Sequence, residues 1–442
     1  MAKHGSPTDT LAPGVPANNS RAVPRLTTID RSLPTGQTLE DLVPPDHEVR
    51  QVFSLVEQMI DVSAIEGKIK AVEGVPGRDA TPPLLLVALW VYATMEKVTE
   101  AHELARRCQE HNPYRWMCGG VSLNYHLLSD FRIRQGEWLT AQIERVVEAM
   151  LEEDLIDFEE PVGQDGMRTR AHAGSGSFRS QERLEELAAA NTAQAESLTK
   201  DTEGLSKAQT SARKRAIRER AERIAQAQEE IPLVAASKEQ RKKGDGRHAR
   251  ASTTDPEARK MKMGDGGTRP GYNVQFATLL GSLVILGVFV TNIGSDCAQA
   301  TPMMQQIKDA YGQTPNEAYM DGNYSTSQNI EGLADLGITL YSPVKQPAKD
   351  LAKGIDPYAP KRRDTPLMED WRGRMKTDEA KQKYKQRSKC ELPNAWCRNR
   401  GLSQFVVRGL EKVTEQAKWY VLAYNLQRLA SLRRAKAPEP GC

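Results

Sequence analysis

The feature that most constrains the fold is a long stretch without charge. No residue in Pro270–Ser295 is charged, and Ala277–Val290 within it is strongly apolar. This apolar core is shorter than the roughly 20 residues that a membrane-spanning helix needs. Its glycines and β-branched residues favour strand over helix. We therefore predict no membrane span but two buried strands, roughly Tyr272–Leu280 and Leu283–Thr291, joined by a type II′ turn at Gly281-Ser282.

The overall composition and charge say less about the class of protein than this uncharged stretch does. The 442 residues include 61 Lys plus Arg and 58 Asp plus Glu, which gives a net charge of +3. This balance neither requires nor excludes a nucleic-acid partner. Six cysteines are too few for a disulfide scaffold in a chain of this length, which indicates a reducing compartment. The first residues lack the apolar segment of a signal peptide, so we predict a cytoplasmic protein.

The first part of the chain has a helical pattern. Residues 1–38 are rich in Pro, Ser, Thr and Gly and are predicted to be a flexible tail. Residues 39–158 are predicted to form an all-α domain that binds DNA. Within it, Thr81-Pro82-Pro83 precedes an apolar run, as at the start of a buried helix. Short helices with turns between them, one of them near Ser129–Arg132, fit a helix-turn-helix.

The pattern changes after Glu160. Pro161–Gly166 is predicted to be a short strand that ends in an acidic turn. Residues 181–231 have the composition of a long polar helix with one apolar stripe, and Pro232 is predicted to end it. A basic run follows, so we interpret residues from about 180 to 250 as a helical insertion between two strands.

Strands and helices alternate after the insertion. A helix is predicted over Thr301–Tyr311, a strand over Ala318–Gly322, and further helices over Glu369–Lys389 and Phe405–Leu432. Residues 159–432 are therefore predicted to be a mixed α/β domain behind the all-α domain, with residues 433–442 as a tail.

Two aspartates are predicted to lie at the ends of strands. Asp165 and Asp321 each follow a short apolar or neutral run and precede a glycine. Carboxylates at the ends of adjacent strands are suitable ligands for Mg²⁺, which prefers oxygen. Asp-Gly is also a common turn sequence, so either aspartate alone would more often be structural.

A third acidic residue lies in a cationic segment. Tyr384, Arg387, Glu391 and Arg398 are spaced so that one continuous helix would display them on one face. An acid between cations and a phenol suits a site that holds both a metal ion and a phosphate. The alternative is a solvated charged helix.

Several segments together resemble a known family. They are Leu89–Tyr92, Ser129–Arg132, Gln164–Arg168, Asp255–Arg259, Tyr272–Gln275, Gly294–Asp296, Asp321–Tyr324 and Tyr384–Arg398, followed by Asn399–Leu402 and Arg408-Gly409. The sequence resembles the transposases of bacterial insertion sequences over most of residues 40–430. The most specific match is the family's Tyr-x2-Arg-x3-Glu-x6-Lys/Arg signature.

The resemblance implies a ribonuclease-H-like catalytic fold with an Asp-Asp-Glu triad. It implies that Asp165, Asp321 and Glu391 bind the catalytic Mg²⁺ or Mn²⁺, as two ions. It also implies that Tyr384, Arg387 and Arg398 hold DNA phosphate or orient the acid. The same site would cut the end of the element and then join the freed 3′-hydroxyl to target DNA.

Further contacts with DNA are expected from cationic positions. Lys242 and Lys243 belong to a basic run, Lys238–Arg250, which would neutralise phosphates without reading sequence and would otherwise be a solvated loop. Arg132 and Arg134 lie in the candidate recognition helix of the all-α domain. Because two element ends have to be brought together, a homodimer or larger assembly on DNA is expected.

Three features depart from the family's pattern, one of which is Leu279-Leu280-Gly281 in place of a more polar hairpin turn. Pro393 would either kink the helix that carries Glu391 or begin a new segment, and Cys297 stands where a histidine is expected. The alternatives are therefore a catalytically inactive, transposase-derived DNA-binding protein or repressor, and a nuclease of the same fold that does not join strands.

Overall fold

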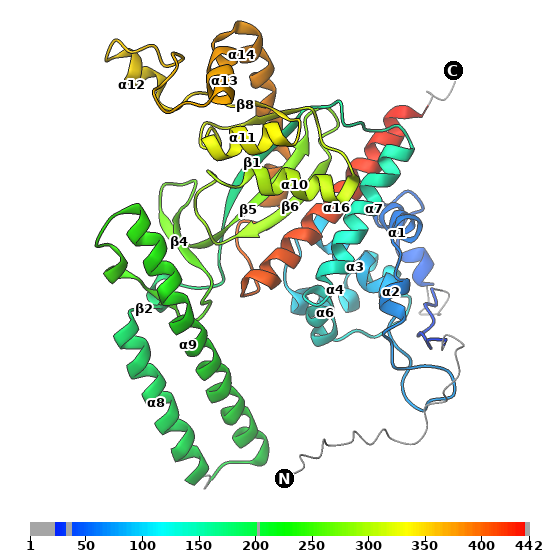
Figure 1. Cartoon of the computed structure of the whole chain (residues 1–442). Helices are drawn as coiled ribbons and strands as arrows, with labels where there is room; N and C mark the ends of the chain where they lie inside the picture. Colours follow the sequence, from blue (N-terminus) through cyan, green and yellow to red (C-terminus); the bar gives the residue numbers. More distant parts are fainter. Residues whose placement is uncertain (1–22, 32–37, 201–203, 438–442) are drawn as a thin grey trace, which may run out of the picture.

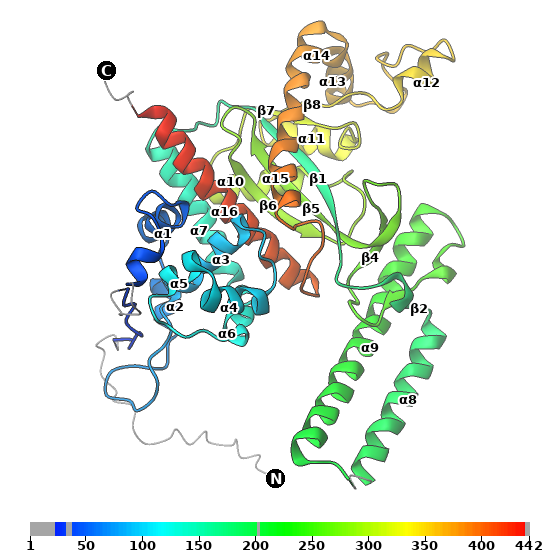
Figure 2. The same cartoon turned by 180° about the vertical axis from the view of Figure 1, so that it is seen from behind.

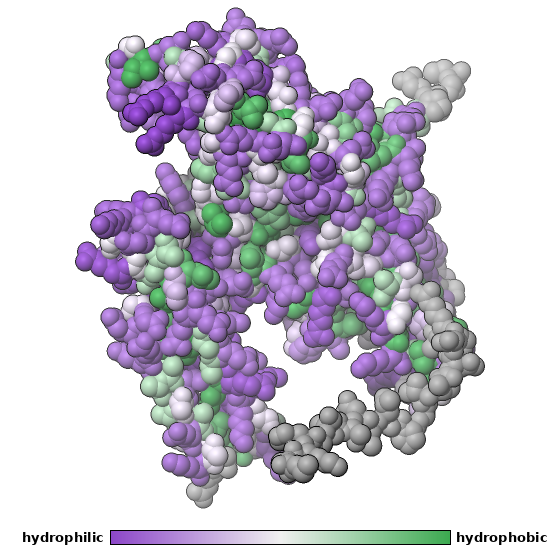
Figure 3. Space-filling model, viewed as in Figure 1, coloured by the Kyte–Doolittle hydropathy of each residue, from purple (hydrophilic) through white to green (hydrophobic). Residues whose placement is uncertain are grey.

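The computed structural model describes residues 23–31, 38–200 and 204–437. It contains a group of helices from the N-terminal part of the chain, a mixed sheet with helices on both faces, and a long helical hairpin that projects to one side (Figures 1 and 2). On the face shown in Figure 3, hydrophilic residues cover most of the surface. The lower part of the hairpin stands apart from the N-terminal helices, whereas its upper end joins the sheet. Among the helices of the described ranges, none combines the length and the apolar character that crossing a membrane requires.

The sheet contains both parallel and antiparallel pairs. Its strand order is β4-β5-β1-β7-β8, and β6 also pairs with β5. The central strand β1 (Val162–Arg170) is antiparallel to β5 (Thr268–Leu279) and parallel to β7 (Glu317–Met320). The remaining strands are β4 (Arg259–Lys262), β6 (Ile285–Thr291) and β8 (Thr339–Tyr341). The predicted mixed α/β architecture is confirmed.

The uncharged stretch forms the antiparallel pair β5 and β6, as predicted. The turn between them differs from the predicted type II′ turn, because Leu283 rather than Gly281 has a positive φ, of 63°. Glu160 holds this turn through its Oε2, which accepts hydrogen bonds from the backbone N–H groups of Gly281 (2.8 Å) and Ser282 (2.6 Å). The conformation of the turn is therefore determined by a side chain from outside the hairpin and not by the local preference of Gly281-Ser282.

Helices cover both faces of the sheet. Figures 1 and 2 show α10 (Ala300–Tyr311) and α11 (Ser327–Asp335) on one face, and α15 (Glu391–Asn399) and α16 (Leu410–Lys436) on the other. The segment before α15 contains α12 (Pro347–Leu351), α13 (Pro366–Lys376), α14 (Asp378–Lys385) and the 3-10 helix η4 (Gln386–Cys390). These helices leave the sheet buried from both sides, as its parallel pairs require.

The helix α16 differs at both ends from the prediction over Phe405–Leu432. It begins only at Leu410, because Phe405 is held extended by a hydrogen bond from its N–H to the Arg170 carbonyl (2.8 Å). It continues to Lys436, past the predicted start of a tail at residue 433. Arg433 there forms an ion pair with Glu153 (2.5 Å).

The N-terminal part contains a set of packed helices. They are η1 (Leu39–Leu42), α1 (Glu48–Met59), α2 (Ser63–Glu66), α3 (Pro83–Met95), α4 (Ala101–Glu110), α5 (Asn112–Cys118), α6 (Tyr125–Arg132) and α7 (Gly136–Glu152). The helix α3 begins at Pro83, as predicted, and is apolar and buried on nearly all sides. It packs with α7 against α16, so one hydrophobic core runs through these helices and the sheet.

Part of the predicted tail is packed against these helices. Most of residues 1–38, and residues 438–442, lie outside the described ranges. Residues 23–31 do not behave as a free tail: the Thr27 N–H donates to the Ala80 carbonyl (2.9 Å), and the Arg31 guanidinium lies 4.3 Å from the centre of the Trp116 ring.

The insertion is a hairpin of two long helices, α8 (Gln181–Lys200) and α9 (Lys207–Arg241). It lies between the short antiparallel strands β2 (Phe178–Arg179) and β3 (Ala251–Ser252), in the range where a helical insertion is expected, about 180–250. The prediction that Pro232 ends the helix is wrong, since α9 continues to Arg241. Pro232 is exposed, so water can satisfy the carbonyl that loses its helical partner.

The insertion has a small core of its own, separate from the main one. It consists of Leu184, Ile224, Ala227 and Ala251. We expect a variant in which residues 181–249 are replaced by a short Gly-Ser turn between β2 and β3 to keep the rest of the chain folded. Circular dichroism should show one cooperative thermal transition near that of the full chain.

A deletion of residues 101–132 is the contrasting variant. It removes helices that belong to the main core, and we expect it to lose the cooperative transition. Loss of cooperative melting in the variant without the hairpin would contradict the separation of the two cores.

Candidate active site

The register of β1 and β7 brings two aspartates together. Gln164 on β1 pairs with Met320 on β7, and the two strands are parallel, so Asp165 and Asp321 are the next residues on neighbouring strands. Asp321 follows the end of β7, as predicted. Asp165 does not end its strand, because β1 continues to Arg170 while it pairs with β5. Both carboxylates nevertheless lie at the edge where β7 stops.

Two side chains from the C-terminal segment hold Asp165. Arg387 Nη2 donates to Asp165 Oδ1 (2.9 Å), and Asn394 Nδ2 donates to Oδ2 (2.7 Å). Burial raises the pKa of the Asp165 carboxyl above its ordinary value; the Arg387 charge opposes this shift and the nearby Asp321 charge adds to it. Asp165 is therefore a half-buried acid whose negative charge depends on nearby donors.

Arg387 also joins Glu391 to this group. Its Nη1 lies 3.1 Å from Glu391 Oε1, so one guanidinium contacts both acids. The Glu391 side chain is 60% exposed, whereas that of Arg387 is 17% exposed. Tyr384 is half-buried nearby, and burial raises the pKa of its phenol. Arg398 is exposed in the last turn of α15.

The segment from Tyr384 to Arg398 is not one continuous helix, contrary to the expected single face. Tyr384 lies on α14, Arg387 on the 3-10 helix η4, and Glu391 begins α15. Of the two outcomes expected for Pro393, the structure has the second, because the proline is the third residue of a new helix. Its missing N–H costs no helical hydrogen bond in the first turn. Pro393 is therefore compatible with the position of Glu391.

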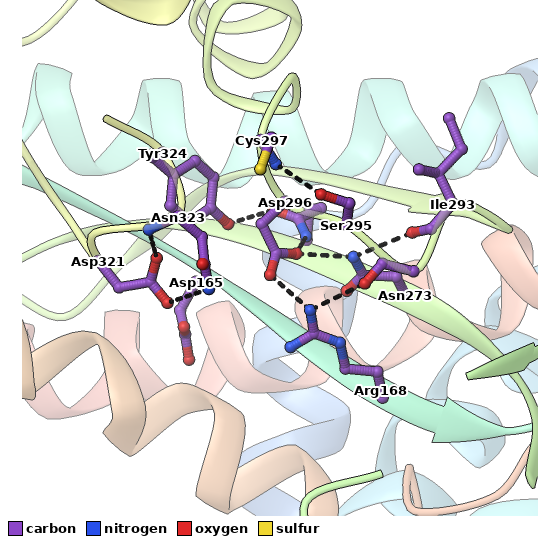
Figure 4. Close-up of polar contacts among 12 residues, drawn as sticks. Asp165, Arg168, Asn273, Ile293, Ser295, Asp296, Cys297, Asp321, Asn323 and Tyr324 are labelled. Atoms are coloured by element: carbon purple, nitrogen blue, oxygen red, sulfur yellow. Dashed lines mark hydrogen bonds and ion pairs between the residues drawn. The ribbon is translucent and has the colours of Figure 1, made fainter. Parts of the chain in front are cut away.

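Asp321 lies in a tight turn with Asn323 and Tyr324. The backbone N–H of Asn323 donates to Asp321 Oδ1 (2.7 Å), and that of Tyr324 donates to the Asp321 carbonyl (3.1 Å). Figure 4 shows Asp321 and Asp165 near each other, with Tyr324 next to Asn323 and its hydroxyl directed toward the side of Asp296. Ser342 Oγ donates to the Asp321 carbonyl as well (2.6 Å), which ties the turn to the segment after β8.

Other residues of the site were not singled out by sequence reasoning. Asn394 follows Pro393 and matches no pattern, yet it is 4% exposed and contacts Asp165 directly. Asp296, Asn273 and Gln275 belong to segments of the family resemblance without an assigned role. They form a buried polar network with Arg168, which Figure 4 shows beside the two aspartates.

Arg132 is not placed to contact DNA, contrary to the expectation from its sequence. It is 5% exposed, its guanidinium lies 4.5 Å from the centre of the Trp90 ring, and it donates to the Thr99 carbonyl. Burial lowers the pKa of Arg132 to about 10. Its neighbour Arg134 is exposed and pairs with Asp130 (3.0 Å). Arg132 therefore stabilises the packing of α3 and α6.

Lys242 and Lys243 are exposed at the end of α9, on the insertion and not beside Asp165 (Figure 1). The basic run that contains them is folded on itself. Lys238 Nζ donates to the His248 carbonyl (3.0 Å), and Glu239 accepts from the backbone N–H groups of Gly244 and Gly246 (2.7 and 3.1 Å). The two lysines thus project from an ordered cap.

The donor chemistry of the site fits a hard divalent cation. Within the described ranges, no group of three or more His, Cys, Asp or Glu side chains is already arranged around one point as metal ligands. Asp165, Asp321 and Glu391 nevertheless supply oxygen donors, and each Asp165 oxygen accepts a single side-chain hydrogen bond, which leaves lone pairs on both. Carboxylates held by amide and guanidinium donors are common in metal sites.

Comparison with known proteins identifies two family models. Residues 244–426 match the model described as Transposase DDE domain, and residues 37–134 match the model described as Transposase domain (DUF772). The first range contains Asp321 and Glu391, and the second covers α1 to α6; Asp165 lies between them. No curated protein and no solved structure matches the chain.

Gly166 allows the polar network to lie directly against β1. A Cβ at this position would collide with Asp296 Oδ1 and Gln275 Nε2 and would lie 2.9 Å from Asn273 Oδ1. We expect Gly166→Ala to destabilise the protein by about 1–3 kcal/mol, because the buried polar groups must move apart. Urea unfolding should measure this loss.

Gly174→Ala is the matched control. A Cβ there would meet nothing within 4 Å, so its free energy of unfolding should stay near that of the wild type. Equal effects of the two substitutions would contradict the close approach at Gly166.

Proposed function

Because the chain belongs to the DDE transposase family, we propose that it is the transposase of an insertion sequence. It cleaves the phosphodiester bonds at the ends of its element and joins the freed 3′-hydroxyl groups to target DNA. The observation that carries this proposal is the register of β1 with β7, which places Asp165 beside Asp321, together with the contact of Arg387 with both Asp165 and Glu391. A mixed sheet with helices on both faces is consistent with a ribonuclease-H-like catalytic domain.

Asp165, Asp321 and Glu391 would hold the divalent ions, Mg²⁺ or Mn²⁺, two in number. Bound ions supply Lewis-acid chemistry for an in-line displacement at phosphorus. The protein's own contribution is positional: two acids are fixed on neighbouring strands, and the third begins a helix. The position of Glu391 at the start of α15 is electrostatically favourable, because the helix dipole stabilises a negative charge there.

Arg387, Tyr384 and Arg398 would contact the scissile and adjacent phosphates. Arg387 donates to Asp165 and Glu391 in the absence of DNA, and its guanidinium has the fork geometry that binds a phosphate in two places. Arg398 is exposed seven residues beyond Glu391 and can reach the DNA backbone. The guanidinium group of Arg387 would then neutralise both the DNA phosphates and the carboxylates of Asp165 and Glu391.

DNA would also contact the exposed lysines at the end of the insertion, Lys242 and Lys243. In this proposal the helices of residues 37–134 recognise the sequence of the terminal repeats. Arg132, which is buried, does not take part. At least two copies of the chain would act together, because transposition brings two element ends to one target.

Asp321→Asn tests the chemistry. With a labelled duplex that carries the end of the element, the wild type should nick DNA in Mg²⁺ and not in EDTA. The variant should be slower by at least roughly a hundredfold, because several kcal/mol of charge stabilisation are lost. Asp335→Asn, on the exposed end of α11, makes the same change of charge and should cut at the wild-type rate.

Binding of the duplex without nicking in any condition would overturn the enzymatic proposal and favour the repressor. Nicking without strand joining would favour a nuclease.

A paired substitution tests the lysines of the insertion. Lys242→Gln with Lys243→Gln should weaken duplex binding for all sequences and reduce the slope of log affinity against log salt by about two. Lys349→Gln with Lys353→Gln, on and just after α12, removes two exposed lysines elsewhere and should leave the slope unchanged. Equal slopes for both pairs, measured by fluorescence anisotropy, would exclude Lys242 and Lys243 from the interface.

A further inference from the structure

A buried polar network lies on the face of the sheet opposite to the Asp165 carboxylate. Successive residues of β1 point to opposite faces. A Cβ at Gly163 would meet Cys390, on the side of α15, whereas a Cβ at Gly166 would meet Asp296. The members of the network are Gln164, Arg168, Asn273, Gln275, Asp296 and Tyr324. The network therefore supports the catalytic strands from behind.

Asp296 is the centre of this network. Its Oδ1 accepts hydrogen bonds from Asn273 Nδ2 (2.7 Å) and Gln275 Nε2 (2.8 Å), and its Oδ2 accepts one from Arg168 Nη2 (2.6 Å). The residue is 3% exposed. With three donors already around it, this carboxylate has the surroundings of a structural anion and not those of a free metal ligand.

The charge of Asp296 determines the orientation of the Gln275 amide. An ionised carboxylate only accepts hydrogen bonds, so the Gln275 NH₂ group must face it. The Gln275 carbonyl oxygen then faces the other way, where it accepts from Tyr324 Oη (2.7 Å) and Gln164 Nε2 (2.9 Å). A reversed amide would place an NH₂ group against two donors inside a buried region, where unpaired donors are costly.

Tyr324 connects this amide to the turn that carries Asp321. Its side chain is fully buried, and its backbone N–H donates to the Asp321 carbonyl (3.1 Å). Asn329 Nδ2 donates both to the Tyr324 carbonyl (2.9 Å) and to the Cys297 carbonyl (2.8 Å), which attaches the same turn to the loop that contains Asp296. The turn is therefore held at both its side chain and its backbone.

We propose that Asp296 is a positioning residue for Asp321, acting through Gln275 and Tyr324. This inference rests on the proposed function, because it assumes that Asp321 binds a metal ion. Asp296 itself contacts neither metal nor DNA. Its carboxylate determines which groups donate and which accept in the hydrogen bonds that lead to the 321–324 turn. This turn then holds the Asp321 carboxylate beside Asp165.

The test measures Mn²⁺ binding to the full-length protein by calorimetry. Tyr324→Phe removes only the hydroxyl that reaches Gln275. Asp296→Asn removes the charge and replaces one acceptor oxygen by an NH₂ donor, which would face donors of the network. Both should weaken Mn²⁺ binding by roughly 10–100-fold, the usual cost of losing a residue that orients a metal ligand. Both should also need more Mg²⁺ to nick DNA, while their affinity for the duplex stays unchanged.

Tyr311→Phe is the matched control. It removes a tyrosine hydroxyl on the same face of the sheet, one that donates to the Leu286 carbonyl (3.1 Å) and does not touch the 321–324 turn. Its effect on thermal stability should resemble that of Tyr324→Phe, whereas its Mn²⁺ affinity should equal that of the wild type.

Asp321→Asn separates the failure of this inference from that of the proposed function. If Asp321→Asn abolishes Mn²⁺ binding while Tyr324→Phe and Asp296→Asn bind as the wild type does, the positioning role is wrong and the proposed function stands. If Asp321→Asn binds Mn²⁺ as well as the wild type, both are wrong.

Discussion

The parallel pairing of β1 with β7 is the constraint on which the rest of the α/β part of the chain depends. Two parallel strands need a long connection, because the chain has to return to the same end of the sheet. In this protein the connection contains the whole insertion, β4 to β6 and α10. Asp165 and Asp321 are therefore far apart in sequence and adjacent in space. The strand β5, which lies between them in sequence, pairs with β1 along its whole length and helps to fix the strand that carries Asp165.

The C-terminal segment completes the site from the other face of the sheet. Arg387 and Asn394 reach Asp165, and α16 then packs against both the sheet and the N-terminal helices. The beginning of α16 is held by the Asp255–Arg259 segment: Asp255 Oδ1 accepts from the Gly409 N–H (3.1 Å), and Glu257 Oε2 accepts from the Leu410 N–H (2.8 Å). A carboxylate at the start of a helix also complements its dipole. A segment of the family resemblance thus has a structural task.

Sequence patterns predicted those parts of the fold in which local chemistry and final structure agree. The uncharged stretch around Phe276 became a buried pair of strands, and the polar helical stretch became an insertion. The prediction for Asp165 failed because pairing with β5 overrides the turn preference of Asp-Gly. Asn394 contacts Asp165, which is 229 positions away, and Asp296 contacts side chains of two other strands, so no local pattern reveals them. Arg132 was misjudged because its charge is satisfied inside the protein by the Trp90 ring and a backbone carbonyl.

The shared core around α16 has a mechanical consequence. Trp419 packs between the N-terminal helices and donates to the Arg132 carbonyl (3.0 Å), so a hinge motion between the helices and the sheet would expose aromatic surface to water. The N-terminal helices and the sheet are therefore expected to move as one rigid unit. The hairpin of α8 and α9 has a separate core and paired entry and exit strands, and the ion pair of Glu230 with Arg259 joins it to β4. A movement of the hairpin would therefore break a polar contact but would expose little of the main core.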